Sequence, residues 1–121
     1  MKIAITSLGK ALDSEVDPRF GRCQFFLMVD SETMNFTAHD NLSAMQRGGA
    51  GPMAVKAISD LGANVLITGD VGPNAFDALK AAGIPAFTGA SGTVSQVIQK
   101  WKKGELKETG TASVDSHAGM K

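Results

Sequence analysis

Hydrophobic residues occur along this chain in two kinds of pattern: short apolar runs, and longer segments in which they recur every three or four positions. Five short apolar runs are bounded by glycine or polar residues and predict strands; they lie at residues 1–6, 23–30, 33–40, 65–67 and 84–87. The second run is apolar at successive positions, which favours a strand covered on both faces. The third alternates Met34, Phe36 and Ala38 with polar residues, so we expect a half-exposed edge strand that forms a hairpin with the second.

Three longer segments repeat apolar residues every three or four positions, as a helix packed on one face does; they lie at residues 52–61, 73–82 and 93–103. Pro52 and Pro73 stand at the starts of the first two, where the missing N–H of proline costs nothing. Thr93 and Gln96 form a capping-box pattern at the start of the third. A glycine follows each segment and is expected to end it: Gly62, Gly83 and Gly104.

The predicted order of elements is βββαβαβα, which indicates an α/β fold with a five-stranded mixed sheet flanked by helices. If the first three strands pair as antiparallel neighbours and the later crossovers are right-handed, only the second strand runs against the others. The loops that follow the parallel strands then meet at one end of the sheet, and all three predicted helices begin there. Ligands of open α/β sheets bind at this carboxyl end.

Composition sets limits on what the chain can do. Its 121 residues suffice for one domain, which we place at residues 1–108, followed by a flexible tail at 109–121. Twelve basic and twelve acidic residues cancel, so no net charge favours binding to nucleic acid. No signal peptide and no apolar run long enough for a membrane span is visible, and we expect a cytoplasmic protein. The single cysteine, Cys23, excludes an internal disulfide.

The loops at the carboxyl end carry residue types that bind anions. All three arginines of the chain, Arg19, Arg22 and Arg47, fall in these loops. Helix N-termini add backbone N–H donors and the positive end of the helix dipole. Glycine lets the backbone approach a ligand closely, and these loops contain Gly48, Gly49, Gly51, Gly69, Gly72, Gly89 and Gly92. We therefore expect an anion site; the alternative is that Arg19 and Arg22 pair with Asp17 or Asp13 and only fasten their loop.

Other chemistry-bearing residues give weaker signals. Cys23 follows the arginine loop; a lone cysteine is more often a small buried hydrophobe, and metal or sulfide contact is the alternative. His39 falls on the polar face of the edge strand, where a solvated side chain is the default and metal ligation the alternative. Asp70 ends the fourth strand and is expected to cap or brace a loop. No Ser/His/Asp set, paired carboxylates or HExxH motif is present, so we expect a protein that is not an enzyme.

A dinucleotide-binding pattern also has to be weighed. Residues 49–54 match G-x-G-x-x-A, and Asp70 follows at a strand end about twenty residues later, as that fingerprint requires. The residues before Gly49 predict a loop, however, where the fingerprint needs a strand. A small nucleotide- or phosphate-binding domain therefore stays a less supported alternative.

Four motifs occur together that carry a family resemblance. They are MKIAI at the start, VDPRFGR ahead of the strand FFLMVD, GGAGP before the first helix, and TGDVGPNAFDALKAAGI. Together, over about residues 1–106, they resemble the dinitrogenase iron–molybdenum cofactor biosynthesis family. The resemblance implies a ribonuclease-H-like fold. It also implies loop-motif residues at the site: Asp17, Arg19, Phe20, Gly21, Arg22, Gly48, Gly49, Gly51, Gly69, Gly72, Pro73 and Asn74.

Within that family the chain is most similar to the short stand-alone branch of the orange protein, which carries a molybdenum–copper sulfide cluster without covalent protein ligands. The resemblance therefore implies a carrier that holds an anionic metal–sulfur cluster, either molybdenum–copper sulfide or a related molybdenum or iron–sulfur cluster. One alternative is an interaction or regulatory subunit that docks a P-loop ATPase. Another is a nitrogenase cofactor maturation factor, for which only Cys23 and His39 offer the ligands that nitrogenase-type members use.

Overall fold

The computed structural model describes residues 1–45 and 48–110, which contain a five-stranded sheet and three α-helices. The predicted α/β class and element order are confirmed. The elements are β1 (Lys2–Ser7), β2 (Phe25–Asp30), β3 (Phe36–Asp40), the 3-10 helix η1 (Leu42–Met45), α1 (Ala50–Asp60), β4 (Val65–Ile67), α2 (Pro73–Ala82), β5 (Ala86–Phe87) and α3 (Val94–Lys102).

The sheet is mixed and has the strand order β3-β2-β1-β4-β5. β2 runs antiparallel to both β1 and β3, whereas β1, β4 and β5 are parallel neighbours, as expected. From β1 the chain first builds the sheet outward to β2 and β3, and then crosses back through α1 to build β4 and β5 on the other side. The order therefore reverses between β1 and β4, and such a switch point is where α/β sheets form clefts.

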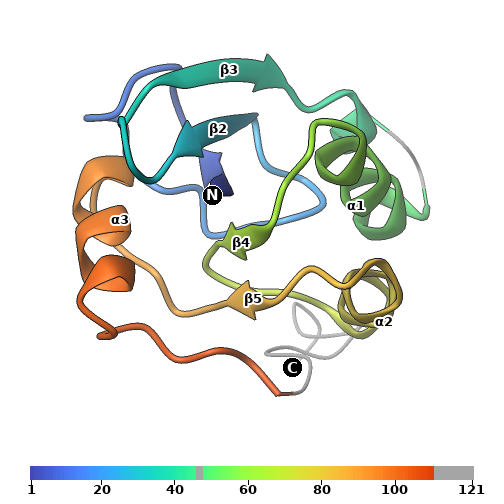
Figure 1. Ribbon diagram of the computed structural model, residues 1–121. Helices are drawn as coiled ribbons and strands as arrows, with labels where there is room; N and C mark the ends of the chain where they lie inside the picture. Colours follow the sequence, from blue (N-terminus) through green and yellow to red (C-terminus); the bar gives the residue numbers. More distant parts are fainter. Residues whose placement is uncertain (46–47, 111–121) are drawn as a thin grey trace.

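Helices cover both faces of the sheet: α1 and α2 lie on one face and α3 on the other (Figure 1). Alternate residues of the inner strands point to opposite faces. In β1, Ala4 packs under α1 and α2, while Ile3 and Ile5 pack against α3. This explains why the inner strands are apolar at successive positions: both of their faces are core.

Two element boundaries differ from the prediction in ways that matter for function. α1 begins at Ala50 rather than at Pro52, because the first turn of a helix needs no intrahelical N–H bonds and so accepts proline at its third residue. The segment expected to be all loop before α1 contains η1. The edge strand β3 begins only at Phe36, since Met34 has a left-handed φ of 64° and belongs to the preceding turn.

The last described residues run along the outer edge of β5. Glu108 forms an isolated antiparallel bridge with Phe87, and the Thr109 N–H donates to the Ala86 carbonyl at 2.8 Å. The expected domain boundary after residue 108 thus falls inside this contact; residues 111–121 lie outside the described part of the chain. None of the helices in the described residues is both long and apolar enough to cross a bilayer.

Candidate functional site

A pocket of about 600 Å³ opens at the carboxyl end of the sheet, on the side of α1 and α2. Three segments that are distant in the sequence form its walls: the loop after β1 (18–22), the start of α1 (49–52) and the turn from β4 into α2 (70–75). These are the segments that flank the switch point between β1 and β4. Nine expected site residues line it: Arg19, Phe20, Gly21, Arg22, Gly49, Gly51, Gly72, Pro73 and Asn74.

Close backbone approaches hold these three segments together, and each requires glycine. A Cβ on Gly69 would lie 2.5 Å from the Pro18 Cα, and one on Gly21 would lie 2.8 Å from the Gly51 nitrogen. A Cβ on Gly51 would lie 2.8 Å from the Cβ of Ala75, so the first turns of α1 and α2 are in contact. Any larger residue at these positions would force the pocket walls apart.

The first turns of α1 and α2 present unused backbone donors at the pocket wall. Their N-cap residues are Gly49 and Gly72, and neither helix has a side-chain cap. Within the described residues no acceptor bonds the N–H groups of four pocket-lining residues: Ala50, Gly51, Asn74 and Ala75. A helix N-terminus without a cap leaves such N–H groups and the positive dipole end available to an anion.

The start of α3 does not join this site, which corrects the expectation that all three helix N-termini converge. The N–H groups of Val94 and Ser95 donate to the carbonyls of Ser14 and Leu12 at 2.9 Å, and Gln96 N–H donates to the Thr93 hydroxyl. The predicted capping box is present, and it uses up the donors that an anion would need. α3 also packs on the opposite face of the sheet, so its turn with Gly89 and Gly92 lies outside the pocket lining.

Arg19 is held by Asp17, as the alternative for this loop proposed. Asp17 is completely buried, and its two carboxylate oxygens accept from the Arg19 Nε at 3.2 Å and Nη2 at 3.3 Å. The same carboxylate accepts from the backbone N–H groups of Arg19 and Gln24, each at 3.0 Å. The hydrogen bond and the charge of Asp17 raise the pKa of Arg19. Since 57% of the Arg19 side chain stays exposed and Arg19 lines the pocket, this pair orients a guanidinium there.

Arg22 reaches across to the segment before α1. Its Nη1 donates to the Ala44 carbonyl in η1 at 2.6 Å, and the residue remains exposed at the pocket wall. The two described arginines therefore differ: Arg19 is fixed from within its own loop, and Arg22 links that loop to η1. Arg47, the third expected arginine, lies outside the described residues.

One acid, Asp70, also lines the pocket. Its backbone N–H donates to the Pro18 carbonyl at 2.8 Å and pairs the turn after β4 with the loop after β1. Its side chain is exposed and has no ion pair or hydrogen bond in the described part of the chain. The expected role as a cap or brace is therefore filled by the backbone of Asp70 and not by its carboxylate.

Cys23 lies beneath the pocket loop and not in the pocket wall. It is fully buried in the core under α1 and α2. Its Sγ accepts a hydrogen bond from the Asn41 Nδ2 at 3.5 Å. Burial, followed by the nearby negative charge of Asp17, raises the pKa of the Cys23 thiol to about 12. The Asn41 amide also donates to the carbonyls of Gly21 and Cys23, so this buried cluster supports the arginine loop from below.

The remaining expected site residues are not gathered at the pocket. His39 lies on the edge strand β3, where its Nε2 forms a hydrogen bond with the Thr37 hydroxyl at 2.8 Å. The residue lines a different pocket. Gly48 is exposed outside the pocket lining, and Gly69 is buried behind it. The residues that the structure describes contain no group of three or more His, Cys, Asp or Glu side chains able to hold a metal ion.

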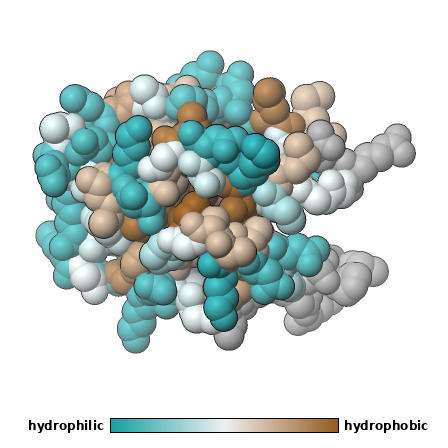
Figure 2. Space-filling view, turned by 45° about the vertical axis from the view of Figure 1, so that its right-hand side comes forward, coloured by the Kyte–Doolittle hydropathy of each residue, from teal (hydrophilic) through white to brown (hydrophobic). Residues whose placement is uncertain are grey.

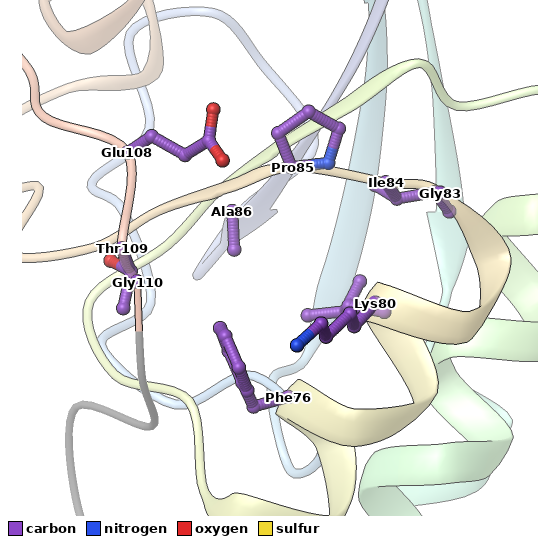
Figure 3. Close-up of a pocket in the computed structure, with 10 residues that line it drawn as sticks. Phe76, Lys80, Gly83, Ile84, Pro85, Ala86, Glu108, Thr109 and Gly110 are labelled. Carbon is purple, nitrogen blue, oxygen red and sulfur yellow. The ribbon is translucent and has the colours of Figure 1, made fainter.

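A smaller pocket of about 300 Å³ lies at the outer edge of β5. Figure 3 shows Phe76 and Lys80 extending from α2 on one side of it and Glu108 and Thr109 on the other. It lies at the C-terminal end of α2, where the dipole is negative and the Gly83 N–H already donates to the Lys80 carbonyl. The described lining of this pocket includes no helix N-terminus, so it does not offer an anion the N–H donors that line the larger pocket.

Comparison with known proteins identifies the family and supports the fold. Residues 1–104 match the family model described as dinitrogenase iron-molybdenum cofactor. The chain belongs to this family. It is 41% identical to the orange protein of Desulfovibrio gigas, whose apo structure superposes with a TM-score of 0.91 and covers 93% of this chain and 95% of that one.

Two further relatives extend the comparison. A putative NifB protein from Thermotoga is 38% identical, with a TM-score of 0.78 and coverage of 93% of this chain and 97% of the other. An uncharacterised protein of Methanocaldococcus jannaschii is 24% identical over 112 residues, which are 89% of this chain and 95% of the relative. The family and its fold thus agree with the motifs that the sequence analysis singled out, whereas the ribonuclease-H-like label stays a prediction.

Sequence reasoning missed Ala50 and Ala75 as pocket residues. Both contribute through a backbone N–H, and no side-chain pattern marks such a donor. A signal was nonetheless present in each case, because each alanine stands in the first turn of a helix with a glycine N-cap. A helix that begins without Ser, Thr, Asp or Asn leaves its N–H groups without a side-chain cap.

Proposed function

We propose that this protein binds and carries an anionic metal–sulfur cluster at the pocket between β1 and β4, without catalysing a reaction. The family supports a role in metal-cluster binding or cofactor biosynthesis. The observation that carries the proposal is the convergence in one pocket of four backbone N–H groups, from Ala50, Gly51, Asn74 and Ala75, that no acceptor among the described residues bonds.

The donor set fits sulfide better than it fits a bare metal ion. Bridging and terminal sulfides accept hydrogen bonds from N–H groups, whereas a cation needs carboxylate, imidazole or thiolate ligands. The part of the pocket wall that the structure describes offers the guanidinium groups of Arg19 and Arg22, backbone donors and a single carboxylate, that of Asp70. Cys23, the one thiol, is buried and protonated over the physiological pH range because of its raised pKa.

The finer assignment that we propose is a molybdenum–copper sulfide cluster or a related molybdenum or iron–sulfur cluster, taken up as cargo. Likeness to the orange protein supports this choice. The cavity volume of about 600 Å³ is within the range of ligand pockets and accommodates a compact polynuclear anion. The donor set supports non-covalent retention, since no protein thiolate or imidazole lines the described pocket wall.

A second candidate function is the docking of a protein partner, for which a P-loop ATPase is our proposal. Leu42 and Met45 in η1 are 75% and 86% exposed, and Met53 in α1 is 46% exposed. Figure 2 shows hydrophobic surface on the face that includes α1 and α2. Since η1 is tied to the pocket through Arg22, such a partner would sit next to the cargo.

Reconstitution tests the first proposal. The apo protein is mixed with tetrathiomolybdate and copper(I), desalted, and followed by absorbance and metal analysis. We expect charge-transfer bands and bound molybdenum to remain with the protein fraction. If the colour passes through while a mononucleotide or a P-loop ATPase is retained under the same conditions, cluster binding is wrong and the corresponding alternative replaces it.

A further inference from the structure

The carboxylate of Asp70 stands among hydrogen-bond donors in a pocket that we propose binds an anion. Asp70 lines the same pocket as Arg19 and Asn74. A carboxylate at an anion site weakens binding, because like charges repel strongly where water is partly excluded. Binding is not weakened in this way if a positively charged part of the ligand lies next to the carboxylate. The placement of this one acid therefore carries information about the ligand.

Neighbouring structure does not neutralise Asp70. Its backbone pairs with the loop that carries Arg19, yet the Arg19 guanidinium is bonded to both oxygens of Asp17. No ion pair or side-chain hydrogen bond of Asp70 occurs within residues 1–45 and 48–110. The exposed carboxylate also does not cap α2, whose N-cap is Gly72 without a side-chain bond. The Asp70 side chain is thus exposed at the pocket and unpaired within the described residues.

The formal charges of the described residues around the pocket cancel. Arg19 and Arg22 contribute two positive charges, and Asp17 and Asp70 contribute two negative ones. Attraction for an anion therefore comes from directional donors and from the dipoles of α1 and α2, which act at one side of the pocket. Such a pocket favours a ligand that is negative on one side and less negative or positive on the other over a ligand that is uniformly negative.

We infer that Asp70 is a specificity-determining residue that selects an anion carrying a bound metal cation over the same anion without it. The inference rests on the proposed function. In this arrangement sulfides face the N–H donors of α1 and α2, and the carboxylate of Asp70 faces the side where the cation compensates the charge. Copper(I) is a suitable cation for the test because sulfide ligands bind soft metals preferentially.

Equilibrium dialysis with two probes tests this inference: tetrathiomolybdate alone, and tetrathiomolybdate preloaded with an equimolar amount of copper(I) under anaerobic conditions. The wild type is compared with Asp70→Asn and with the control Asp77→Asn, which changes an exposed acid of α2 outside the pocket lining. Thermal melting establishes that both variants are folded.

We expect Asp70→Asn to bind bare tetrathiomolybdate roughly tenfold more tightly, the order expected when one charge is removed a few ångströms from another near a protein surface. The copper-loaded probe should gain much less, so the preference for it falls, while Asp77→Asn behaves like the wild type. Equal effects of Asp70→Asn on both probes, or no effect, would overturn the inference. If the wild type retains neither probe, the proposed function fails as well, which distinguishes the two results.

Discussion

Asp17 and Arg19 form an ion pair in which the carboxylate is completely buried while most of the guanidinium side chain remains in solvent. The pair is anchored from below, because the Thr6 hydroxyl donates to the Asp17 carbonyl at 2.7 Å and also bonds the Thr68 hydroxyl. Thr6 lies at the carboxyl end of β1, and Thr68 directly follows β4. The switch point of the sheet is thus connected through hydrogen bonds to a charged group at the pocket.

This connection leads to a stability prediction. Asp17→Ala leaves the N–H groups of Arg19 and Gln24 without their acceptor, and we expect it to lower the free energy of unfolding by about 2–4 kcal/mol. Asp17→Asn keeps one acceptor oxygen and should cost less. Urea unfolding measures both, with Asp13→Ala as the control at an exposed position of the same loop. Equal stability of Asp17→Ala and Asp13→Ala would contradict the role assigned to Asp17.

Contact between the two helix starts can be tested by adding and removing one methyl group. Gly51→Ala places a Cβ against the Cβ of Ala75, and we expect a loss of about 1–3 kcal/mol from overpacking. Ala75→Gly makes room for that Cβ, so it should cost less in the Gly51→Ala background than in the wild type. A double-mutant cycle from chemical denaturation gives the coupling. Additive effects would mean that α1 and α2 do not touch at this point.

Both arginines of the described pocket wall should contribute to cluster retention. Arg19→Ala and Arg22→Ala each remove a charge-assisted donor, and we expect retention of the thiomolybdate–copper probe to weaken roughly tenfold in each variant. Lys56→Ala is the matched control, because Lys56 is an exposed base of α1 outside the pocket, paired with Asp60 at 2.9 Å. If all three variants bind alike, the site lies elsewhere on the molecule.

The Cys23 thiol should be unreactive in the folded protein. Because its pKa is raised to about 12 from an ordinary value of 9.0, it stays protonated at pH 8 and should react with iodoacetamide only after unfolding. The unfolded chain ionises first, so this group's contribution to stability is complete below pH 9 and is lost as the pH rises toward 12. Cys23→Ala should show a shallower loss of stability over that window. Rapid labelling of the native protein would contradict the burial.

Truncation tests the contact at the outer edge of β5. A chain that ends at Lys107 loses the bridge of Glu108 with Phe87 and the Thr109–Ala86 hydrogen bond, and we expect it to be less stable by about 1 kcal/mol. A chain that ends at Gly110 keeps both contacts and should melt like the full-length protein. If the two truncated chains melt together, Glu108 and Thr109 do not contribute to the domain.

Much of the fold follows from local patterns in the sequence. The apolar runs, the glycines after each helix and the capping box of Thr93 and Gln96 determined the element order, because hydrophobic period and helix termini are properties of neighbouring residues. Right-handed crossovers then placed the arginine loop and the start of α1 at the same end of the sheet. The family resemblance rested on these same loops.

The tertiary structure decided which of those groups form a site. Only in the tertiary structure do the first turns of α1 and α2 come into contact through Gly51 and Ala75. α3 packs on the other face of the sheet, where its first N–H groups donate to the carbonyls of Leu12 and Ser14. Backbone donors, burial and ion pairing depend on neighbours that are distant in the sequence. For this reason the sequence indicated the end of the sheet at which we propose that a ligand binds, and the packing of the helices determined which donors line that pocket.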